Sequence, residues 1–445
     1  MKRRSILQMG LASLAISAVP YGATALSGKS VIVVGAGIAG LSAAQALSSA
    51  GAEVTVLEAN SRIGGRIHTD RSLGAPFEAG AAWIHGPSAG NPLAQMVAQH
   101  DIKTYVTEDE SLTLYHPDGS DFSAADYRHF DRLEAKIDAA LGELSPQSQS
   151  PNLGHALRAA LGDTLDDPLS AWILSAFYEF DFGASLDQLS ARYTFEDSVF
   201  PGTDVILPDG FDHLIRLLST GLTIHTNSPV QSIAQSETGV SVDGRAADYA
   251  VVCVPLGVLK AGHIRFSPAL PTPLQAAIER LGFGTVTKIA LKFDRPFWDI
   301  RSQYFGLLTP RDAPRGRWPY WINYRRFSQE NILLGLCFGD YAHHADAMDD
   351  AALQDDALAM LSRAWGTDIP TPTAMLRTAW SQDRLFQGTY SYTRQDSTPA
   401  HYKAFTGRPS GRVLWAGEHT HFAYHGTAHG ALMSGQRAAK TLIAT

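Results

Sequence analysis

The chain has 445 residues, which is too long for one ordinary domain and suits two or three domains that share interfaces. Its composition, with 45% hydrophobic and 18% charged residues, is that of a soluble globular protein and excludes a disordered or fibrous chain. Acidic residues outnumber basic ones 44 to 36, so the formal charge of -8 disfavours a nucleic-acid partner and mildly favours cationic ligands.

Residues 1-25 have the features of an export signal. The basic run Lys2-Arg3-Arg4 precedes an apolar stretch from Ile6 to Val19, and a small-residue cleavage pattern follows it. Paired arginines before Ser-Ile-Leu-Gln resemble the twin-arginine signal, which exports folded proteins. We therefore expect a mature, periplasmic or exported chain that starts near Leu26. No stable membrane span is expected, because the apolar stretch is too short; the alternative is an uncleaved basic tail.

The next residues predict a strand, a helix and a second strand joined by a glycine-rich turn. Ser30 to Val34 is a short β-branched run, Gly35 to Gly40 is the turn, and Leu41 to Ala50 is a small-residue helix. Glu53 to Leu57 then forms the second strand. Such a β-α-β unit places the two strands parallel in an α/β sheet.

The glycine turn has the spacing of a dinucleotide-binding site. Gly35 permits the tight turn, Gly37 lets the backbone approach a pyrophosphate, and Gly40 lets the helix pack closely on the strand. Glu58, at the end of the second strand, would accept hydrogen bonds from ribose hydroxyls and repel the extra phosphate of NADP. The alternative, a glycine turn without a ligand, is disfavoured by the strand, helix and acid around it.

A second glycine turn follows Glu58 directly. Arg62 and Arg66 flank Gly64 and Gly65 in this segment. Guanidinium groups can bind a diphosphate through two parallel hydrogen bonds, and the paired glycines let the backbone pass close to a cofactor.

Two stretches interrupt the nucleotide-binding pattern. Between residues 91 and 203, helical patterns are separated by breaks rich in Pro, Ser and Asp, at Phe130 to Leu144, Gly154 to Leu161 and Pro168 to Phe182. Strand patterns then return at Leu222 to His225, Val230 to Ala234, Val240 to Val242 and Ala250 to Val254. A second excursion begins with a strand at Lys288 to Phe293 and includes a helix near Ala351 to Trp365.

The C-terminal region predicts one more strand and helix, with an acidic residue between them. Arg412 to Ala416 reads as a strand, Gly417-Glu418 follows it, and a helix opens at about Thr427. This order would place a carboxylate near the ribitol hydroxyls of a flavin and amide donors near a flavin carbonyl.

The ordered motifs GAGIAG, ExxxRxGGR, FEAGAAWIHG, KIALKFDRPFW, RVLWAGEHT and YHGTAHGALMSGQRAA resemble the flavin monoamine and polyamine oxidase family, from about residue 30 to the C-terminus. WIHG followed by Gly90-Asn91-Pro92 is most similar to the spermine and acetylpolyamine oxidase branch. The resemblance implies an α/β, Rossmann-like FAD-binding domain of the GR2 type and an interleaved α+β substrate-binding domain. The expected FAD-binding segments are 29-90, 204-262 and 385-445, and the expected substrate-binding segments are 91-203 and 263-384.

The resemblance also implies which residues hold FAD. They are Gly35, Gly37, Gly40, Glu58, Arg62, Gly65, Arg66, Ala82, Trp83, Val230, Trp380, Gly417, Glu418 and Thr427. Of these, the glycines, Glu58 and the two arginines would hold the ADP half, Val230 the adenine, and Glu418 the ribitol. Thr389 occupies the position where some members carry a flavin-linking cysteine, so the resemblance implies non-covalent FAD.

The implied catalytic residues are Lys288, His85 and Tyr390, and the implied substrate contacts are His85, Glu179, Tyr390 and Thr427. Lys288 matches the lysine that reaches the flavin N5 through a water, and His85 could orient an amine or accept its proton. Tyr390 matches one wall of an aromatic pair, and Thr427 replaces the opposite wall. The alternatives are a surface lysine, a packed histidine and, for Glu179, a solvated helix face.

We expect neither a metal site nor a disulfide. A cluster of His419, His421, His425 and His429 has helical spacing, but Gly426-Thr427 interrupts the helix and the segment is assigned to the flavin. Cys253 and Cys337 lie in apolar runs typical of buried thiols. Arg315 to Arg326 mixes aromatic and basic residues as single-strand nucleic-acid binders do, but its alternation favours a sheet in the substrate domain.

The expected reaction is oxidation of an amine, most simply a polyamine, to an imine that hydrolyses to an aldehyde and a shorter amine, with oxygen reduced to hydrogen peroxide. Its partners are the small amine and oxygen. Two enzymes on the same fold remain alternatives: an L-amino-acid oxidase, whose carboxylate-binding arginine is replaced here by Trp83-Ile84-His85, and a dehydrogenase with another electron acceptor. A third alternative is a non-catalytic flavin-binding module.

Overall fold

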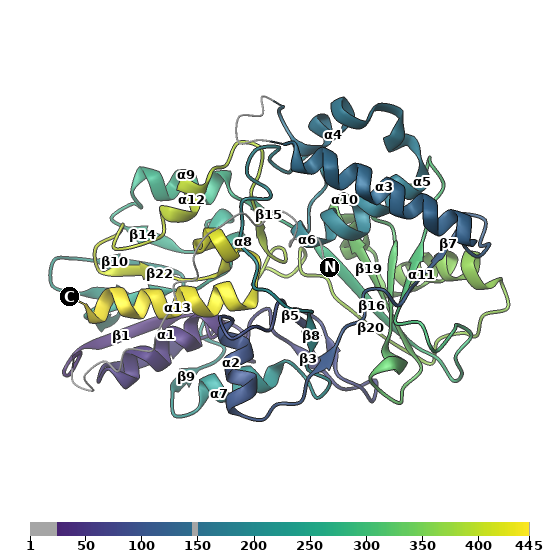
Figure 1. Ribbon diagram of the computed structural model, residues 1–445. Helices are drawn as coiled ribbons and strands as arrows, with labels where there is room; N and C mark the ends of the chain where they lie inside the picture. The colour runs from purple at the N-terminus through teal and green to yellow at the C-terminus, as the bar shows by residue number, and fades with distance from the viewer. Residues whose placement is uncertain (1–24, 145–149, 445) are drawn as a thin grey trace.

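The computed structural model describes residues 25-144 and 150-444, and the predicted export signal lies outside them except for Ala25. The described chain forms two lobes (Figure 1), one built around the helices α1 and α13 and the other around a large sheet with α3 and α11 beside it. Among the helices described, none is long and apolar enough to cross a membrane.

A five-stranded parallel sheet with the order β22-β13-β1-β2-β9 forms the centre of the first lobe. Its strands are β1 (Ser30–Val34), β2 (Glu53–Leu57), β9 (Thr223–His225), β13 (Tyr249–Val252) and β22 (Val413–Trp415). Because parallel strands end at the same edge of a sheet, the glycine turn after β1, the acid after β2 and Gly417-Glu418 after β22 all meet at one edge.

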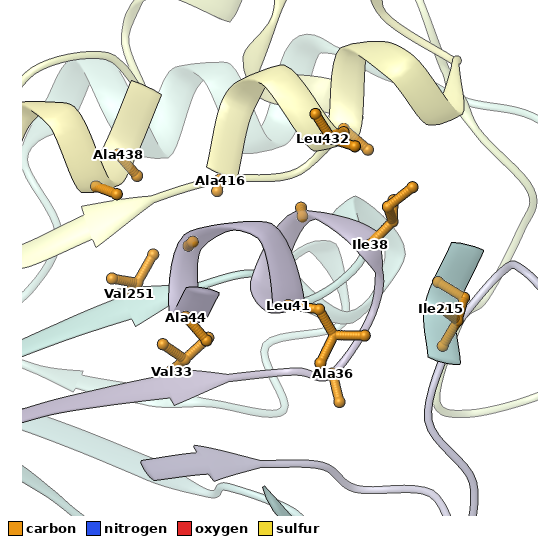
Figure 2. Packing of buried hydrophobic residues seen from close by; sticks show 14 of the residues in the cluster. Val33, Ala36, Ile38, Leu41, Ala44, Ile215, Val251, Ala416, Leu432 and Ala438 are labelled. Carbon is orange, nitrogen blue, oxygen red and sulfur yellow. The ribbon is translucent and has the colours of Figure 1, made fainter. Parts of the chain in front are cut away.

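Helices α1 (Ile38–Ser49) and α13 (Ala428–Ile443) pack on one face of this sheet, with α7 (Asp212–Ser219) beside them. Figure 2 shows Leu41 and Ala44 of α1 between the strand residue Val33 and the α13 residues Leu432 and Ala438. The helix α1 begins before the predicted start at Leu41, because the glycine turn leads directly into its first turn.

A four-stranded sheet with the order β12-β11-β10-β14 extends the same lobe. Its strands are β10 (Ser232–Gln235), β11 (Val240–Val242), β12 (Arg245–Ala247) and β14 (Arg265–Ser267), and α9 (Thr272–Arg280) packs beside them. The boundary predicted between residues 262 and 263 is therefore wrong. Ile264, Leu274 and Leu281 belong to the same core as Ile32 of β1, so the chain leaves this lobe only after α9.

The boundary predicted between residues 90 and 91 is also wrong, for the same reason. Helix α2 (Pro92–Gln99) was expected in the substrate-binding domain, but it packs against α13 and α7. Leu93 and Val97 are buried in the core of the first lobe. The apolar face of a short helix does not indicate which of two cores will bury it.

A six-stranded sheet with the order β20-β16-β19-β18-β17-β7 forms the second lobe, antiparallel except where β7 runs beside β17. Its strands are β7 (Leu112–Tyr115), β16 (Val286–Lys292), β17 (Tyr304–Leu307), β18 (Tyr320–Asn323), β19 (Ile332–Phe338) and β20 (Ala374–Arg377). Side chains alternate along a strand, so Ile289 and Leu291 of β16 pack with α11 (Asp350–Trp365), while Val286 and Ala290 face the opposite core. Lys288 shares that second face.

Helices cover the other side of this lobe: α3 (Ala124–Gly142), α4 (Leu153–Leu161), α5 (Pro168–Ile173), a π-helical turn (Leu174–Glu179) and α6 (Phe180–Phe182). Helix α3 begins earlier than the predicted start at Phe130. The Ser123 hydroxyl accepts hydrogen bonds from the amides of Ala125 and Asp126, and the Asp126 carboxylate caps Ser123 in return.

The remaining elements are short. They are β3 (Thr69–Asp70), β4 (Phe77–Glu78), β5 (Trp83–Ile84), β6 (Tyr105–Val106), β8 (Val205–Ile206), α8 (Leu256–Lys260), β15 (Gly282–Phe283), α10 (Gly339–Ala347), β21 (Ser391–Tyr392) and α12 (Pro399–Lys403). Strands β3, β4 and β5 follow the second glycine turn directly, and β5 pairs with β8. Ile84 of β5 and Val205 of β8 are buried in the core of the first lobe.

Candidate active site

A cavity of about 920 Å³ lies between the two lobes. One part is lined by both glycine turns and by the segments that follow β2, β13 and β22, and another part by α3, α6 and the large sheet. Its volume is near the upper end for ligand pockets, as a site for a dinucleotide and a second molecule requires.

The two glycine turns touch each other at the edge of the parallel sheet. The Gly64 amide donates to the carbonyl of Ala36 at 2.8 Å, and Gly65 has a φ of +58°, which a side chain would strain. A Cβ on Gly40 would lie 1.9 Å from the Gly35 carbonyl oxygen, so only glycine allows α1 to pack this closely on the turn. Gly35, Gly37, Gly64 and Gly65 line the cavity.

Glu58 is held rigidly at the end of β2, where it lines the cavity. Its carboxylate accepts the Ala36 amide at 2.7 Å and the Asn60 amide at 2.8 Å. A carboxylate has about four acceptor sites, so these two contacts leave capacity for ribose hydroxyls.

The prediction that Arg62 binds the cofactor is wrong. Its guanidinium donates to the carbonyl of Gly65 at 2.9 Å and lies 6.0 Å from the ring of Phe386, and its side chain does not line the cavity. Arg62 therefore stabilises the second glycine turn, because its guanidinium donates to the carbonyls of Ile63 and Gly65 in that turn.

Arg66 lines the cavity but pairs with the C-terminal element. Its Nη1 lies 2.8 Å from Glu418 Oε1 and donates to the Thr389 carbonyl at 2.6 Å. The structure thus places Arg66 beside the segment predicted to hold the ribitol. This differs from the prediction that it holds the ADP half, because the buried Glu418 carboxylate attracts the guanidinium.

Glu418 is the centre of a buried polar cluster. It is only 4% exposed, and it accepts hydrogen bonds from the Ser391 hydroxyl at 2.5 Å and from the Gly426 amide at 3.0 Å. Burial opposes its ionisation, but Arg66, His419 and these hydrogen bonds lower the pKa of Glu418 to about 2. It remains charged at every physiological pH.

His419 is a buried histidine from which we expect an acid sensitivity of the fold. The side chain is 1% exposed, neither ring nitrogen has a hydrogen-bond partner among the described residues, and burial lowers its pKa from 6.5 to about 4. A group whose folded pKa lies below its unfolded pKa contributes stability above the unfolded value, and that stability is lost as the pH falls towards the folded value. We expect the free energy of unfolding to fall by on the order of 3 kcal/mol between pH 6.5 and pH 4 from this group alone.

Urea unfolding at pH 7 and at pH 5 measures this effect. His419→Met should remove most of the difference, because methionine fills similar space and takes no proton. His155→Met is the control, since His155 is exposed and should leave the pH dependence unchanged. If the free energy of unfolding of His419→Met falls between pH 7 and pH 5 as much as that of the wild type, other groups cause the acid sensitivity.

The first turn of α13 also faces the cavity. Thr427 caps the helix, accepting the Gly430 amide at 3.0 Å and donating to the Tyr424 carbonyl at 2.8 Å. Thr427, Ala428 and Ala431 line the cavity. The backbone amides at the start of a helix are suited to an electron-rich carbonyl or an anion.

Lys288 reaches the cavity from the large sheet. It is 6% exposed, and its Nζ donates to the carbonyls of Glu78 at 2.9 Å and Gly80 at 2.7 Å. The ring of Trp83 lies 5.8 Å away. The alternative of a surface lysine is therefore wrong: a buried ammonium with two backbone acceptors stands at the cavity wall.

His85 lines the cavity with a partner that the sequence did not reveal. Its Nδ1 lies 2.7 Å from Asp204 Oδ2, and Asp204 Oδ1 accepts the Gly86 amide at 3.0 Å. Burial raises the pKa of Asp204, but the His85 ring and the Gly86 amide outweigh it and hold this pKa below its usual value. An ionised carboxylate only accepts, so Nδ1 carries a proton, and in the neutral ring the lone pair is then on Nε2.

Tyr390 joins the two lobes at the cavity. Its hydroxyl donates to the carbonyl of Phe180 at 2.5 Å, and its ring would lie 3.1 Å from a Cβ placed on Gly183. The wide turn before Phe180 interrupts the helix predicted from Pro168 to Phe182. It carries Phe180 and Asp181 to the cavity, and π-helical turns are frequent at functional sites.

The prediction that Glu179 binds substrate is wrong. The side chain is 2% exposed, pairs with Arg315 at 2.9 Å and accepts the Leu186 amide at 3.1 Å, and it does not line the cavity. Glu179 is instead occupied by Arg315, and the nearby Asp181 lines the cavity.

A set of acidic side chains in the second lobe was missed by the sequence reasoning. Asp109, Glu110, Asp131, Glu134 and Asp181 line the cavity. Asp131 and Glu134 share a helical face with Tyr127 and Phe130, at the spacing i, i+3, i+4, i+7. That mixed aromatic and acidic face was visible in the sequence, but which cavity it would line was not.

The remaining residues predicted to bind the cofactor fit an elongated flavin dinucleotide. Ala82, Trp83, Val230, Trp380 and Gly417 line the cavity. The Trp380 indole donates to the Ala79 carbonyl at 3.0 Å, which fixes the ring in place. The glycine turns, Glu58 and Val230 could hold the ADP half, and Glu418 and the start of α13 could hold the ribitol and ring. In the described part of the chain, no group of three or more potential ligand side chains is arranged to hold a metal.

The sequence matches the family described as flavin containing amine oxidoreductase over residues 38–443. Polyamine oxidase 4 of Oryza sativa subsp. japonica is 32% identical over 441 residues, covering 93% of this chain and 88% of that protein. Lysine-specific histone demethylase 1 homolog 1 of the same plant is 33% identical over 467 residues, covering 98% of this chain and 55% of that protein. Wild-type putrescine oxidase bound to putrescine shares the fold, with a TM-score of 0.73, 20% identity, and coverage of 94% of this chain and 99% of that one.

Proposed function

Because the chain belongs to the flavin-containing amine oxidoreductase family and its cofactor is FAD, we propose that this amine-oxidising enzyme acts on polyamines. The observation that carries the proposal is the acidic lining of the second lobe beside Lys288 and His85. A polyamine carries several ammonium groups along a flexible apolar chain. It would therefore match a cavity in which carboxylates alternate with aromatic rings.

The relatives support the same substrate class. Polyamine oxidase 4 of Oryza sativa subsp. japonica and polyamine oxidase 2 of Arabidopsis thaliana, at 32% and 31% identity, are named for polyamines. The net charge of -8 adds a general attraction for cations. An L-amino-acid oxidase would instead need a cation for the substrate carboxylate beside His85, where this chain has Trp83 and Ile84.

In the proposed reaction one carbon-nitrogen bond of the polyamine is oxidised to an imine, which water hydrolyses. The net change converts an amine, oxygen and water to an aldehyde, a shorter amine and hydrogen peroxide. FAD, when bound, supplies the acceptor for the two electrons. The reacting nitrogen must be uncharged, because its lone pair forms the new carbon-nitrogen double bond.

The chain's own residues then have separate tasks. His85 Nε2 accepts a proton from the reacting ammonium or orients the neutral amine. It can do so because Nδ1 donates its proton to Asp204, which leaves the lone pair of the neutral ring on Nε2. Tyr390 and Phe180 form a fixed wall through their hydrogen bond. Lys288 presents its ammonium at the flavin side of the cavity, and the distal carboxylates bind the ammonium groups that do not react.

Two further features belong to the proposal. FAD is bound without a covalent link, because Thr389 stands at the linking position and its hydroxyl donates to the Gly284 carbonyl at 3.0 Å. The enzyme is exported in its folded, FAD-loaded form through the twin-arginine route, on the basis of the paired arginines near the start of the sequence.

Anaerobic mixing of the purified yellow protein with spermidine tests the function. We expect the flavin colour to bleach, and the products identified by mass should include an aldehyde and a shorter amine. The bleaching rate at low spermidine should rise by about tenfold per pH unit between pH 7 and pH 9, because the fraction of uncharged amine rises in that proportion.

A matched pair of variants separates polyamine recognition from general damage. Glu134→Gln should raise KM for spermidine by about tenfold and leave KM for a simple monoamine nearly unchanged, since only the polyamine has a distal charge. Asp163→Asn removes an exposed acid and should change neither value. Bleaching by L-amino acids, or by no amine at all, would contradict the proposal.

A further inference from the structure

Glu78 is a buried carboxylate that does not line the cavity and has no task in the proposed reaction. It is 6% exposed, in the short strand β4. The Thr69 hydroxyl lies 2.9 Å from both of its oxygens, and the Phe211 amide donates to Oε1 at 2.8 Å. Burying a carboxylate is costly unless it is paired, so its position requires a reason.

The same residue holds the ammonium of Lys288 through its backbone. The Glu78 carbonyl accepts from Lys288 Nζ at 2.9 Å, and the Gly80 carbonyl accepts at 2.7 Å. These two bonds fix the ammonium between the segment that follows β4 and the cavity. Since a lysine ammonium has three donors, one donor remains for the cavity.

The charges of the two side chains depend on each other. Burial lowers the pKa of Lys288 to about 8, and the Glu78 carboxylate is the charge that opposes this loss. Burial raises the pKa of Glu78 to about 7, and hydrogen bonds from Phe211 and Thr69 together with the charge of Lys288 oppose that rise. Each group would leave its charged form more readily without the other.

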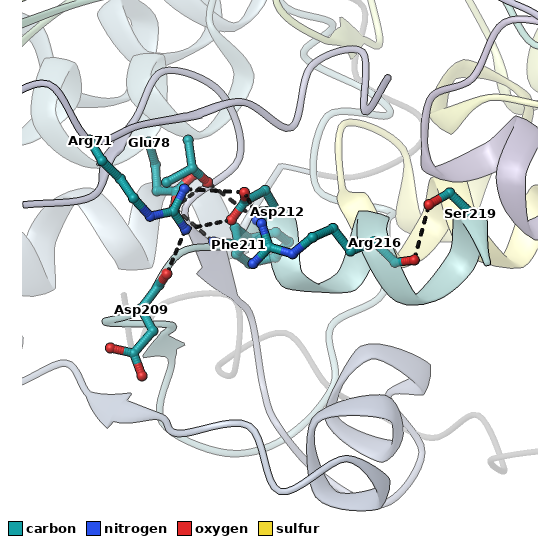
Figure 3. A network of polar contacts seen from close by, with 8 residues as sticks. Arg71, Glu78, Asp209, Phe211, Asp212, Arg216 and Ser219 are labelled. Atoms are coloured by element: carbon teal, nitrogen blue, oxygen red, sulfur yellow. Dashed lines mark hydrogen bonds and ion pairs between the residues drawn. The ribbon is translucent and has the colours of Figure 1, made fainter. Parts of the chain in front are cut away.

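A network of more exposed charged residues lies next to Glu78 (Figure 3). Asp212 pairs with Arg71 at 2.8 Å and with Arg216 at 2.6 Å, and its amide donates to the Thr69 hydroxyl at 3.2 Å. The groups that face Glu78 are therefore Lys288, Asp212, Arg71 and the phenol of Tyr324. Asp212 disfavours the charged carboxylate of Glu78, whereas Lys288 favours it.

We propose that Glu78 is the counter-ion of Lys288, a positioning residue that keeps the ammonium charged and in place at the flavin wall of the cavity. The pair sets the local positive charge beside the flavin, which tunes the electronic state of a bound cofactor. The inference depends on FAD binding and on no particular substrate.

The flavin spectrum of the holoenzyme, recorded without any amine from pH 6 to pH 10, tests this role. Loss of the Lys288 charge should appear as a pH-dependent change of the flavin absorption, and Lys288→Met should abolish that change. Glu78→Gln should move the midpoint down by about one pH unit, a tenfold change in the protonation constant. Glutamine retains an oxygen that can accept the Phe211 amide, so the local fold has the same acceptor.

Two variants of the surrounding groups predict shifts of opposite sign. Thr69→Val removes a hydrogen bond that favours the charged carboxylate, so the midpoint should also move down, although Glu78 remains. Asp212→Asn removes a charge that disfavours it, so the midpoint should move up by a smaller amount. A role limited to supporting the fold would shift neither midpoint.

An unchanged midpoint in Glu78→Gln would overturn the proposal, as would a pH-dependent change that persists in Lys288→Met. Should Glu78→Gln fail to retain FAD, Thr69→Val decides in its place: a downward shift supports the pairing and no shift refutes it. Because no amine is added, an enzyme that failed to oxidise polyamines would still give a clear answer.

Discussion

Replacing Arg66 with methionine is expected to deplete the protein of FAD and to lower its free energy of unfolding by about 3 to 5 kcal/mol. The variant leaves the Glu418 carboxylate 4% exposed and without its 2.8 Å partner. An unpaired buried charge is far more costly than an unpaired charge at the surface. Methionine retains much of the side-chain length, so the effect comes mainly from the lost charge.

FAD content after purification and urea unfolding of the apoprotein measure the two parts of this effect separately. The double variant Arg66→Met with Glu418→Gln should recover part of the stability, because no buried charge is left unpaired, and the cycle yields the coupling energy. Arg301→Met removes an exposed pair with Asp299 and should cost no more than about 1 kcal/mol. Equal stability losses in Arg66→Met and Arg301→Met would show that the buried pair has no special weight.

The nucleotide-binding unit was predictable because its signals are local. The β-branched runs of β1 and β2 and the glycines between them lie within one short segment, and the structure confirms both strands. Boundaries between the lobes were not predictable in the same way. Helices α2 and α9 each have an apolar face, but that face does not specify which of the two cores will cover it.

The site residues also differ in how far their surroundings could be predicted from the sequence. The resemblance implied a role for Lys288 beside the cofactor, and the structure places this lysine in the cavity wall, on one face of the buried strand β16. Glu179 and Arg62 were misplaced, since each has a local or long-range partner that the motif does not encode. A π-helical turn shifts the side-chain directions of a helix, so the resemblance that suggested Glu179 did not specify which way its side chain faces.

The contact between His85 and Asp204 could not be predicted from the sequence. Asp204 lies 119 residues after His85 and in a different segment, and only the pairing of β5 with β8 brings the two together. Glu78 lies within one of the family motifs, unlike Asp204. Its contact with Lys288, 210 residues away, nevertheless depends on the packing of the two lobes.

Asp204→Asn is expected to lower kcat/KM for the amine substrate by about 10²-fold or more, the usual range for loss of a positioned proton acceptor. The Gly86 amide should keep the asparagine oxygen, because it donates to Oδ1 at 3.0 Å, and the asparagine NH₂ then faces His85 Nδ1. That nitrogen must accept, so the proton moves to Nε2 and the lone pair that faces the amine is lost.

Nitrogen-15 NMR of labelled histidine reports the tautomer directly, in the absence of any substrate. The wild type should show the proton on Nδ1 of His85 and Asp204→Asn the proton on Nε2. Thr107→Val is the matched control, because its hydroxyl donates to the backbone carbonyl of Asp204 at 2.9 Å, and its removal leaves the carboxylate in place. If Asp204→Asn changes the tautomer but not kcat/KM, His85 orients the amine by its shape alone; if neither changes, the carboxylate has no role in the proton position.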